Sequence, residues 1–325
     1  MSQTILGIDV AKDSLQATLL HQGKTYRRGF VNQPAQFHVL DTWLDKHAVR
    51  ELHACLEATG RYGEAVAEHL YQRGYTVSVV NPARIKGYAT SQLARNKTDA
   101  LDADLIADFC QTQHPPAWVP LAAEIRELQE FAHRYDVLQQ ARQQEVNRLQ
   151  AGLRAEAVRA QTQAHLDFLD QQIEQLKQII HDHIQRHPDL KVRQALLTSI
   201  PGIGELTAAK LQTLELHRFA DARAATAFVG LNPMIRTSGK SVHRRPRLSK
   251  MGDASWRKSL YLPAVSAKRW NPIIAEFCAR LEERDKSTMA IIGAAMRKLL
   301  CLAYGVLKSG KPFDPNYLRS TQVTS

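Results

Sequence analysis

Four carboxylates occupy positions from which they could hold metal ions together. Asp9 lies inside the apolar run 4–10, where an unpaired charge would be expensive to bury. Glu57 closes a second apolar run, and Asp99 and Asp102 lie three residues apart at the start of a helical pattern, so they share one helix face. If the two runs are neighbouring strands and the helix crosses their ends, all four carboxylates converge on one point.

Converging carboxylates repel one another unless cations lie between them. A ligand set made only of oxygen suits Mg²⁺ or Mn²⁺, and two such ions could activate an attacking oxygen and stabilise a leaving one in phosphodiester chemistry. Each acid also has a structural interpretation, since Asp99 could cap a helix after Thr98, and Asp104 or Asp108 could compete with Asp102. The set of four, in the order strand, later strand, helix, is the more specific pattern.

Positive charge is concentrated between Pro233 and Trp270. This stretch holds ten lysines and arginines against one acid, Asp253, and so carries about nine of the eleven net positive charges of the 325-residue chain. Such a run repels itself, and a phosphate backbone offsets that cost because lysine and arginine release its counterions. The charge therefore favours a nucleic-acid partner, although a solvated basic loop is the ordinary alternative.

Several side chains of the basic segment are candidate nucleic-acid contacts. They are Arg236, Lys240, His243, Arg244, Arg245, Arg247 and Lys250. The segment also contains two serines, Ser238 and Ser241. Serines in basic loops more often contact phosphates than attack them, so local spacing selects neither as a nucleophile.

A second candidate contact lies in the segment 200–209. Gly202 and Gly204 would allow a tight turn of the helix-hairpin-helix form, whose backbone N–H groups could face a DNA phosphate at the start of a helix. A simple connection between two helices is the alternative.

The elements that must position these residues begin with an α/β section over 1–118. Apolar and β-branched runs predict antiparallel strands at 4–10, 15–21 and 25–31, with a turn at Gly23-Lys24. Alternating patterns then predict further elements, namely a helix at 34–46, a strand at 51–56, a helix at 62–73, a strand at 75–80 and helices after Pro82 and Asn96. This order predicts an α/β domain with a mixed sheet.

The section 119–190 is expected to be helical. Between Pro120 and Pro188 there is no proline and one glycine, Gly152. Two apolar seams follow four-three spacing. They consist of Leu121, Ile125, Leu128, Ala132 and Tyr135, and of Leu166, Leu169, Ile173, Leu176 and Ile180. A long helical hairpin or an intermolecular coiled coil is predicted, with two helices packed on their own domain as the alternative.

From 191 to 325 the chain is mostly helical, and the basic segment is its one long irregular insert. No apolar run approaches a membrane span and no secretory signal is present, so we expect a cytoplasmic protein without a membrane partner. The four cysteines, at 55, 110, 278 and 301, form no Cys-x-x-Cys pair and are interpreted as buried thiols.

The motifs together resemble a known family. Gly-Ile-Asp at 7–9, Glu-Ala-Thr-Gly at 57–60 and Asn-Lys-Thr-Asp-x-x-Asp-Ala at 96–103 are similar to the signature of the DEDD insertion-sequence transposases of the IS-one-ten class, which are related to Piv-type DNA invertases. The resemblance continues in order through most of the remaining chain. It includes Ser-Ile-Pro-Gly-Ile-Gly-Glu at 199–205, Phe-Val-Gly-Leu-Asn-Pro at 228–233, Ser-Gly at 238–239, Ser-Lys-Met-Gly at 249–252 and Tyr-Gly-Val-Leu-Lys at 304–308.

This resemblance implies specific roles. The section 1–118 would be a RuvC-like, RNase H-type catalytic domain with Asp9, Glu57, Asp99 and Asp102 as its metal-binding tetrad, and 191–325 would be a C-terminal transposase domain. In the family a serine of a Ser-Gly motif attacks DNA and is held through a phosphodiester, and the match is Ser238, with Ser241 as its rival.

The resemblance also implies partners. They are donor and target DNA, an element-encoded structured guide RNA and further copies of the chain as a dimer or tetramer, with bacterial nucleoid association during the reaction. The alternatives are a DNA invertase of the same family, a RuvC-like metal-dependent junction nuclease that needs no serine, and a non-enzymatic nucleic-acid-binding protein with structural carboxylates.

Overall fold

The chain folds into two compact units, residues 1–121 and 122–325. The computed structural model describes residues 3–58, 60–92, 99–238, 242–249, 251–252 and 254–316. The first unit ends close to the predicted boundary at residue 118. The helical section and the C-terminal section lie together in the second unit, and their division into separate functional domains stays a prediction.

The first unit is built on a five-stranded mixed sheet in the order β3-β2-β1-β4-β5. Its strands are β1 (Ile5–Val10), β2 (Ser14–His21), β3 (Lys24–Val31), β4 (His53–Glu57) and β5 (Thr76–Val80). β2 is antiparallel to both β1 and β3, whereas β4 is parallel to both β1 and β5. The predicted mixed α/β sheet is therefore confirmed.

One turn differs from its prediction. The β2–β3 hairpin turns at Gln22 and Gly23, with φ values of 49° and 74°, and not at Gly23-Lys24. Two successive positive φ values give a turn whose twist matches that of the flanking strands, and this leaves Lys24 free to begin β3.

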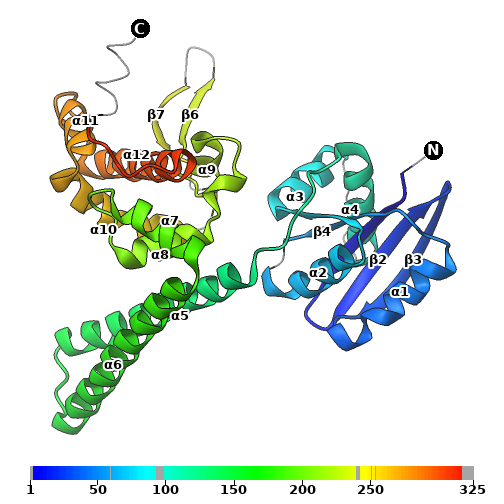
Figure 1. The fold of residues 1–325 in the computed structure, drawn as a ribbon, viewed down its shortest axis with the longest axis horizontal. Helices are drawn as coiled ribbons and strands as arrows, with labels where there is room; N and C mark the ends of the chain where they lie inside the picture. Colours follow the sequence, from blue (N-terminus) through cyan, green and yellow to red (C-terminus); the bar gives the residue numbers. More distant parts are fainter. Residues whose placement is uncertain are drawn as a thin grey trace. The chain divides into compact units, whose positions relative to one another are not determined.

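Helices cover both faces of this sheet (Figure 1). They are η1 (Pro34–Gln36), α1 (Phe37–Lys46), η2 (Gly60–Gly63), α2 (Glu64–Gln72), α3 (Pro82–Ser91) and α4 (Asp99–Gln113). α1 and α2 pack on the face that carries Leu6, Ile8 and Leu56. α3 and α4 pack on the opposite face, against Ile5 and Cys55. Alternate residues of one strand therefore belong to different cores.

The second unit begins with a helical hairpin. α5 (Ala123–Gln150) and α6 (Glu156–Arg186) lie side by side (Figure 1), joined by a short link in which Gly152 has a φ of 83°. Leu166, Leu169, Ile173, Leu176 and Ile180 are all buried, as their spacing predicted. The hairpin is thus observed, while coiled-coil packing and its role in joining copies stay predictions.

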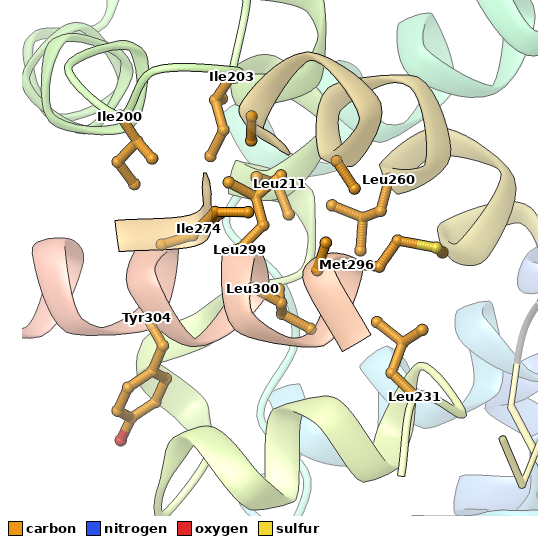
Figure 2. Packing of buried hydrophobic residues seen from close by; sticks show 14 of the residues in the cluster. Ile200, Ile203, Leu211, Leu231, Leu260, Ile274, Met296, Leu299, Leu300 and Tyr304 are labelled. Carbon is orange, nitrogen blue, oxygen red and sulfur yellow. The ribbon is translucent and has the colours of Figure 1, made fainter. Parts of the chain in front are cut away.

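The rest of the second unit is mostly helical. Its elements are α7 (Pro188–Thr198), α8 (Glu205–Thr213), η3 (Leu216–Arg218), α9 (Ala222–Phe228), β6 (Pro233–Ser238), β7 (Val242–Leu248), α10 (Ala254–Trp270), α11 (Pro272–Glu282) and α12 (Thr288–Ser309). Figure 2 shows its core, in which Met296, Leu299 and Leu300 of α12 pack among Leu211, Leu260 and Ile274.

Within the described residues, α12 is the one helix long and apolar enough to span a membrane. Its apolar residues form the centre of the core in Figure 2, so burial in the protein accounts for its composition. Cys55, Cys110 and Cys278 are buried as free thiols, as predicted, and Cys301 is half-buried. Burial raises the pKa of the Cys278 and Cys301 thiols.

Candidate active site

Asp9 and Glu57 lie next to each other at the edge of the sheet that is formed by the carboxyl ends of β1 and β4. β1 and β4 are parallel and paired from Ile5 with His53 through to Ile8 with Leu56, so Asp9 and Glu57 are the next residues along. Neighbouring strands lie about 4.8 Å apart. The expectation that these two strands are neighbours is thus met, and both acids stand at the carboxyl ends of parallel strands.

Both acids lie on the sheet face that α4 covers. Gly7, two residues before Asp9 and therefore on the same face, packs directly against this helix. A Cβ atom at Gly7 would lie 2.4 Å from the carbonyl oxygen of Ala103 and 2.4 Å from the nitrogen of Ala107. Only glycine permits so close an approach, and this contact fixes α4 at the edge that carries the acids.

α4 runs antiparallel to β1 and brings its first turn to this edge. Ile5 shares a small core with Ala107 and Cys110, whereas Gly7 lies against Ala103 and Ala107. Two strand residues advance about 6.6 Å and four helix residues about 6 Å, so Asp9 is level with the start of the helix.

Two predicted ligands belong to that first turn. Asp102 is half-buried there, and the helix begins at Asp99, whose side chain lies outside the described part of the structure. Among the described side chains, no three acids, histidines or cysteines form a group that could hold a metal ion. The tetrad as a metal site therefore stays a prediction, although its backbone positions gather at one edge.

The two competitors of Asp102 have structural partners. Asp104 accepts hydrogen bonds from Thr18 (2.8 Å) and from two nitrogens of Arg27 (2.8 and 2.9 Å), which tie α4 to β2 and β3. Burial raises the pKa of Asp104, but these bonds outweigh it and leave the pKa below its usual value. Asp108 accepts a 2.6 Å hydrogen bond from the Tyr88 hydroxyl. These contacts account for both acids without a metal.

The basic segment forms a β-hairpin and is not the irregular insert that we expected. β6 and β7 are antiparallel, and Ser238, the last residue of β6, is paired with Val242. β-Branched residues and an arginine-rich strand supplied no clear alternation, so the sequence pattern concealed this pairing. Gly239, Lys240, Ser241 and Lys250 lie outside the described residues, so the choice between the two serines stays open.

The backbone register of this hairpin pairs one arginine with another. Arg236 is paired with Arg244, Thr237 with His243 and Met234 with Arg247. Like charges at directly opposite positions destabilise an isolated sheet, and a polyanion would relieve that repulsion. The contacts predicted for these residues and for Arg245 concern side chains outside the described part of the structure, and they stay predictions.

The glycine turn at 200–204 joins α7 to α8 and packs inside its unit. Gly202 has a φ of 103°, and a Cβ atom there would lie 2.6 Å from that of Ala267 on α10. The Asn271 amide also donates to the Pro201 carbonyl. Packing therefore explains why position 202 is glycine. Gly204 is exposed at the start of α8, and phosphate contacts by this turn stay a prediction.

The roles of two residues that hold these elements in place could not be predicted from the sequence. Arg27 fixes α4 through Asp104, and Arg257 bonds to backbone on both sides of the β6–β7 hairpin. The segments 228–233 and 249–252 carried a family signal, but no periodicity revealed that they meet in space.

A mixed α/β sheet with acids at its strand ends, combined with a helical unit that carries a basic hairpin, fits a DNA transposase. Two transposase family descriptions match the chain, "Transposase" (DEDD_Tnp_IS110) over residues 6–157 and "Transposase IS116/IS110/IS902 family" over 194–279. The pilin gene-inverting proteins of Moraxella lacunata and Moraxella bovis are each 32% identical over 97% of this chain and 98% of their own. The chain belongs to the IS110-class transposase family, which is related to the Piv-type invertases.

Among solved structures, Thermus thermophilus RuvC in complex with a Holliday junction substrate resembles part of the chain. The match covers 32% of this chain and 90% of that one, with 14% identity and a TM-score of 0.25. A member of the Ppx/GppA family from Aquifex aeolicus matches 28% of this chain and 39% of its own, with 18% identity and a TM-score of 0.21. Likeness at this level carries no conclusion, and the family assignment rests on sequence.

Proposed function

We propose that this protein is a DNA recombinase that cuts and rejoins DNA through two sets of residues, a carboxylate tetrad in the first unit and a serine in the second. The observation that carries the proposal is the edge at which Asp9 and Glu57 end neighbouring parallel strands beneath the first turn of α4. Family membership supports DNA as the substrate.

The residues at this edge fit a divalent cation. Asp9, Glu57 and Asp102 supply hard oxygen ligands from two strands and a helix, Asp99 begins that helix, and competing acids nearby are bonded elsewhere. Mg²⁺ or Mn²⁺ bound there would stabilise negative charge on a reacting phosphate. The sheet and α4 bring the backbones of these residues to one end of the sheet, and a bound cation would draw their carboxylates together. The RuvC-like assignment of this unit is part of the same proposal.

Ser238 is the proposed nucleophile. Its hydroxyl oxygen attacks the scissile phosphorus and loses its proton to a base, a new P–O bond forms, and the bond from phosphorus to the leaving sugar oxygen breaks. That oxygen takes up a proton and leaves as a hydroxyl. The phosphoserine ester conserves the energy of the broken bond for rejoining, so the exchange needs no energy source. Basic residues around Ser238 would stabilise the charge of the transition state.

The observation that Ser238 ends a β-strand supports this role. A residue at the end of a paired strand has a fixed backbone on one side, so its position relative to the hairpin is defined. Arg236, Lys240, His243, Arg244, Arg245, Arg247 and Lys250 are proposed to bind the DNA backbone, and Gly202 and Gly204 to contact a phosphate.

Site-specific inversion is the second candidate. The curated relatives that cover nearly all of this chain are described as pilin gene-inverting proteins. The same two sets of residues could therefore invert a DNA segment in place, without moving an element to a new site. Excision with integration by an insertion sequence remains the primary proposal because both family matches are to transposases. The two outcomes differ in how cut ends are paired.

The proposal includes partners that the family resemblance implies. A structured RNA encoded by the element would pair with donor and target DNA, and the basic hairpin would suit RNA as well as DNA. The α5–α6 hairpin would join copies into a dimer or tetramer. The protein would act in the cytoplasm, at the bacterial nucleoid.

One experiment tests the covalent step. The protein is incubated with Mg²⁺, junction DNA and RNA from the flanking locus, and then digested, and peptides that span residues 236–244 are analysed by mass spectrometry. We expect a nucleotide adduct on Ser238. An adduct on Ser241 would overturn the serine assignment, and cutting without any adduct would favour the junction nuclease.

A second experiment separates the two outcomes of recombination. A plasmid carries the element's ends in direct or inverted orientation, and sequencing across the junctions counts excised circles and inverted segments. Excised circles with joined ends support transposition. Inversions alone would replace it with the invertase function.

A further inference from the structure

The β6–β7 hairpin is held at the end opposite Ser238 by a set of backbone contacts. The hairpin root consists of residues 228–232 before β6 together with Ser249 and Gly252 after β7. The Ser249 N–H donates to the Asn232 carbonyl at 2.8 Å and closes the two strands. The Asn232 side chain accepts a 2.9 Å hydrogen bond from Thr226, which is fully buried, so this side of the root is joined to α9.

The two sides of the root touch. Gly252 has a φ of 142°, and a Cβ atom there would lie 2.2 Å from the carbonyl oxygen of Phe228 and 2.9 Å from the nitrogen of Gly230. The chain leaving β7 therefore passes directly over the chain that leads into β6. Leu248, the last residue of β7, also lies against Gly293 of α12.

Arg257 bonds both sides of the root at once. Its Nη1 atom donates to the carbonyl of Val229 at 3.1 Å and to that of Gly252 at 3.0 Å. Arg257 lies on α10 and is half-buried, and Val229 is fully buried in the core of the unit. One guanidinium therefore connects the core, both root segments and α10.

The position of Ser238 depends on the angle of the hairpin at this root. β6 has six residues, which span about 20 Å from the root to Ser238. A tilt of about 3° at the root would move Ser238 by about 1 Å, and a displacement of that size can slow a reaction by about 100-fold. Small changes at the root are therefore amplified at the serine.

We propose that Arg257 is a positioning residue that fixes the angle of the β6–β7 hairpin and thereby aims Ser238 at the scissile phosphate. This inference rests on the proposed function, because it takes Ser238 as the nucleophile. Arg257 acts through the backbone of Val229 and Gly252 and touches no reacting atom.

The test compares Arg257→Gln with Lys258→Gln in the full-length protein. Lys258 is the next residue of α10, and it is exposed. Both changes remove one positive charge at almost the same place. The rate of adduct formation on Ser238 is measured in single turnovers at saturating junction DNA with Mg²⁺ and RNA, and DNA affinity is measured over a range of salt concentrations.

We expect Arg257→Gln to lower the saturating rate by about 100-fold, while its DNA affinity and salt dependence change no more than those of Lys258→Gln. If Arg257→Gln keeps the wild-type saturating rate, or if both glutamine variants lose activity only through weaker DNA binding, the proposal is overturned.

Backbone hydrogen exchange gives an independent readout. Exchange at residues 229–232 and at Ser249 should be faster in Arg257→Gln than in Lys258→Gln, without DNA present. If the wild-type protein forms no adduct on Ser238, the proposed function fails, yet this comparison still decides whether Arg257 fixes the root. Unchanged exchange in Arg257→Gln would refute the proposal that Arg257 fixes the hairpin root. Thr226→Val, which removes one root hydrogen bond, provides a milder variant if Arg257→Gln does not fold.

Discussion

The carboxylate edge of the first unit and the serine hairpin of the second are held by different means. β1, which carries Asp9, is bonded on both sides within a five-stranded sheet, and α4 lies against it at Gly7. β6, which carries Ser238, pairs with β7 in a two-stranded sheet, and such a sheet is marginally stable alone. The first site therefore depends on a whole core, whereas the second depends on a few root contacts.

This difference predicts how each site fails. Damage to the carboxylate edge should appear as lost cation binding or as lost stability of the first unit. Damage to the hairpin root should appear as a slower reaction of a protein that still folds and still binds DNA. The variants below separate these outcomes, from the largest expected effect to the smallest.

Ser238→Ala should abolish the adduct and reduce strand transfer by at least about 1,000-fold, because the attacking oxygen is lost. Both DNA affinity and the melting temperature should be retained. The measurement is adduct yield on a denaturing gel with labelled junction DNA, and Ser241→Ala is the matched control. Undiminished strand transfer in Ser238→Ala would show that the reaction needs no serine at this position.

Asp9→Asn and Glu57→Gln should each lower the cutting rate by about 100- to 10,000-fold, because each removes a ligand charge from the proposed cation site. The Mg²⁺-induced rise in melting temperature should shrink in both. Differential scanning fluorimetry with and without Mg²⁺ measures this, and Asp108→Asn, whose acid is bonded to Tyr88, serves as the control. A wild-type thermal shift in the two variants would support structural carboxylates.

Gly7→Ala should destabilise the first unit by about 1–3 kcal/mol, because its methyl group would overlap the backbone of α4. Displacement of α4 should also weaken cation binding. Gly87→Ala is the matched control within the same unit, since a Cβ atom there meets nothing within 4 Å. Urea unfolding measures the stability of both variants. If Gly7→Ala is as stable as Gly87→Ala, the close packing of α4 on β1 is contradicted.

Asp104→Asn should have the smallest effect, a loss of about 0.5–1 kcal/mol, because Arg27 on the other side of the bond is largely exposed. The pKa of Asp104 is lowered in the folded protein. Its contribution to stability is therefore complete above the unfolded pKa of about 3.9 and declines as the pH falls through the lower folded value. Urea unfolding should therefore show a smaller deficit of the variant at pH 3 than at pH 7.

Much of the first unit could be predicted from sequence because its signals are local. Strands such as 4–10 and 15–21 alternate or run apolar within a few residues, and the seam from Leu166 to Ile180 repeats at helical spacing, so each element is encoded by neighbours in the chain. The basic hairpin was not predicted because its strands are rich in charged residues, which do not alternate with apolar ones at the two-residue period of a strand.

The sequence alone determined which residues are candidates for chemistry and where most of the regular elements lie. Asp9, Glu57, Asp99 and Asp102 stood out as candidates from their types and surroundings, and the family could be identified from its motifs. Only the tertiary structure decided that Asp9 and Glu57 end neighbouring strands. The same is true of the ion pair between Asp104 and Arg27 and of the hydrogen bonds from Arg257 to the carbonyls of Val229 and Gly252. These contacts link residues far apart in the chain, and no local periodicity records them, because packing and hydrogen bonding act in space after the elements have formed.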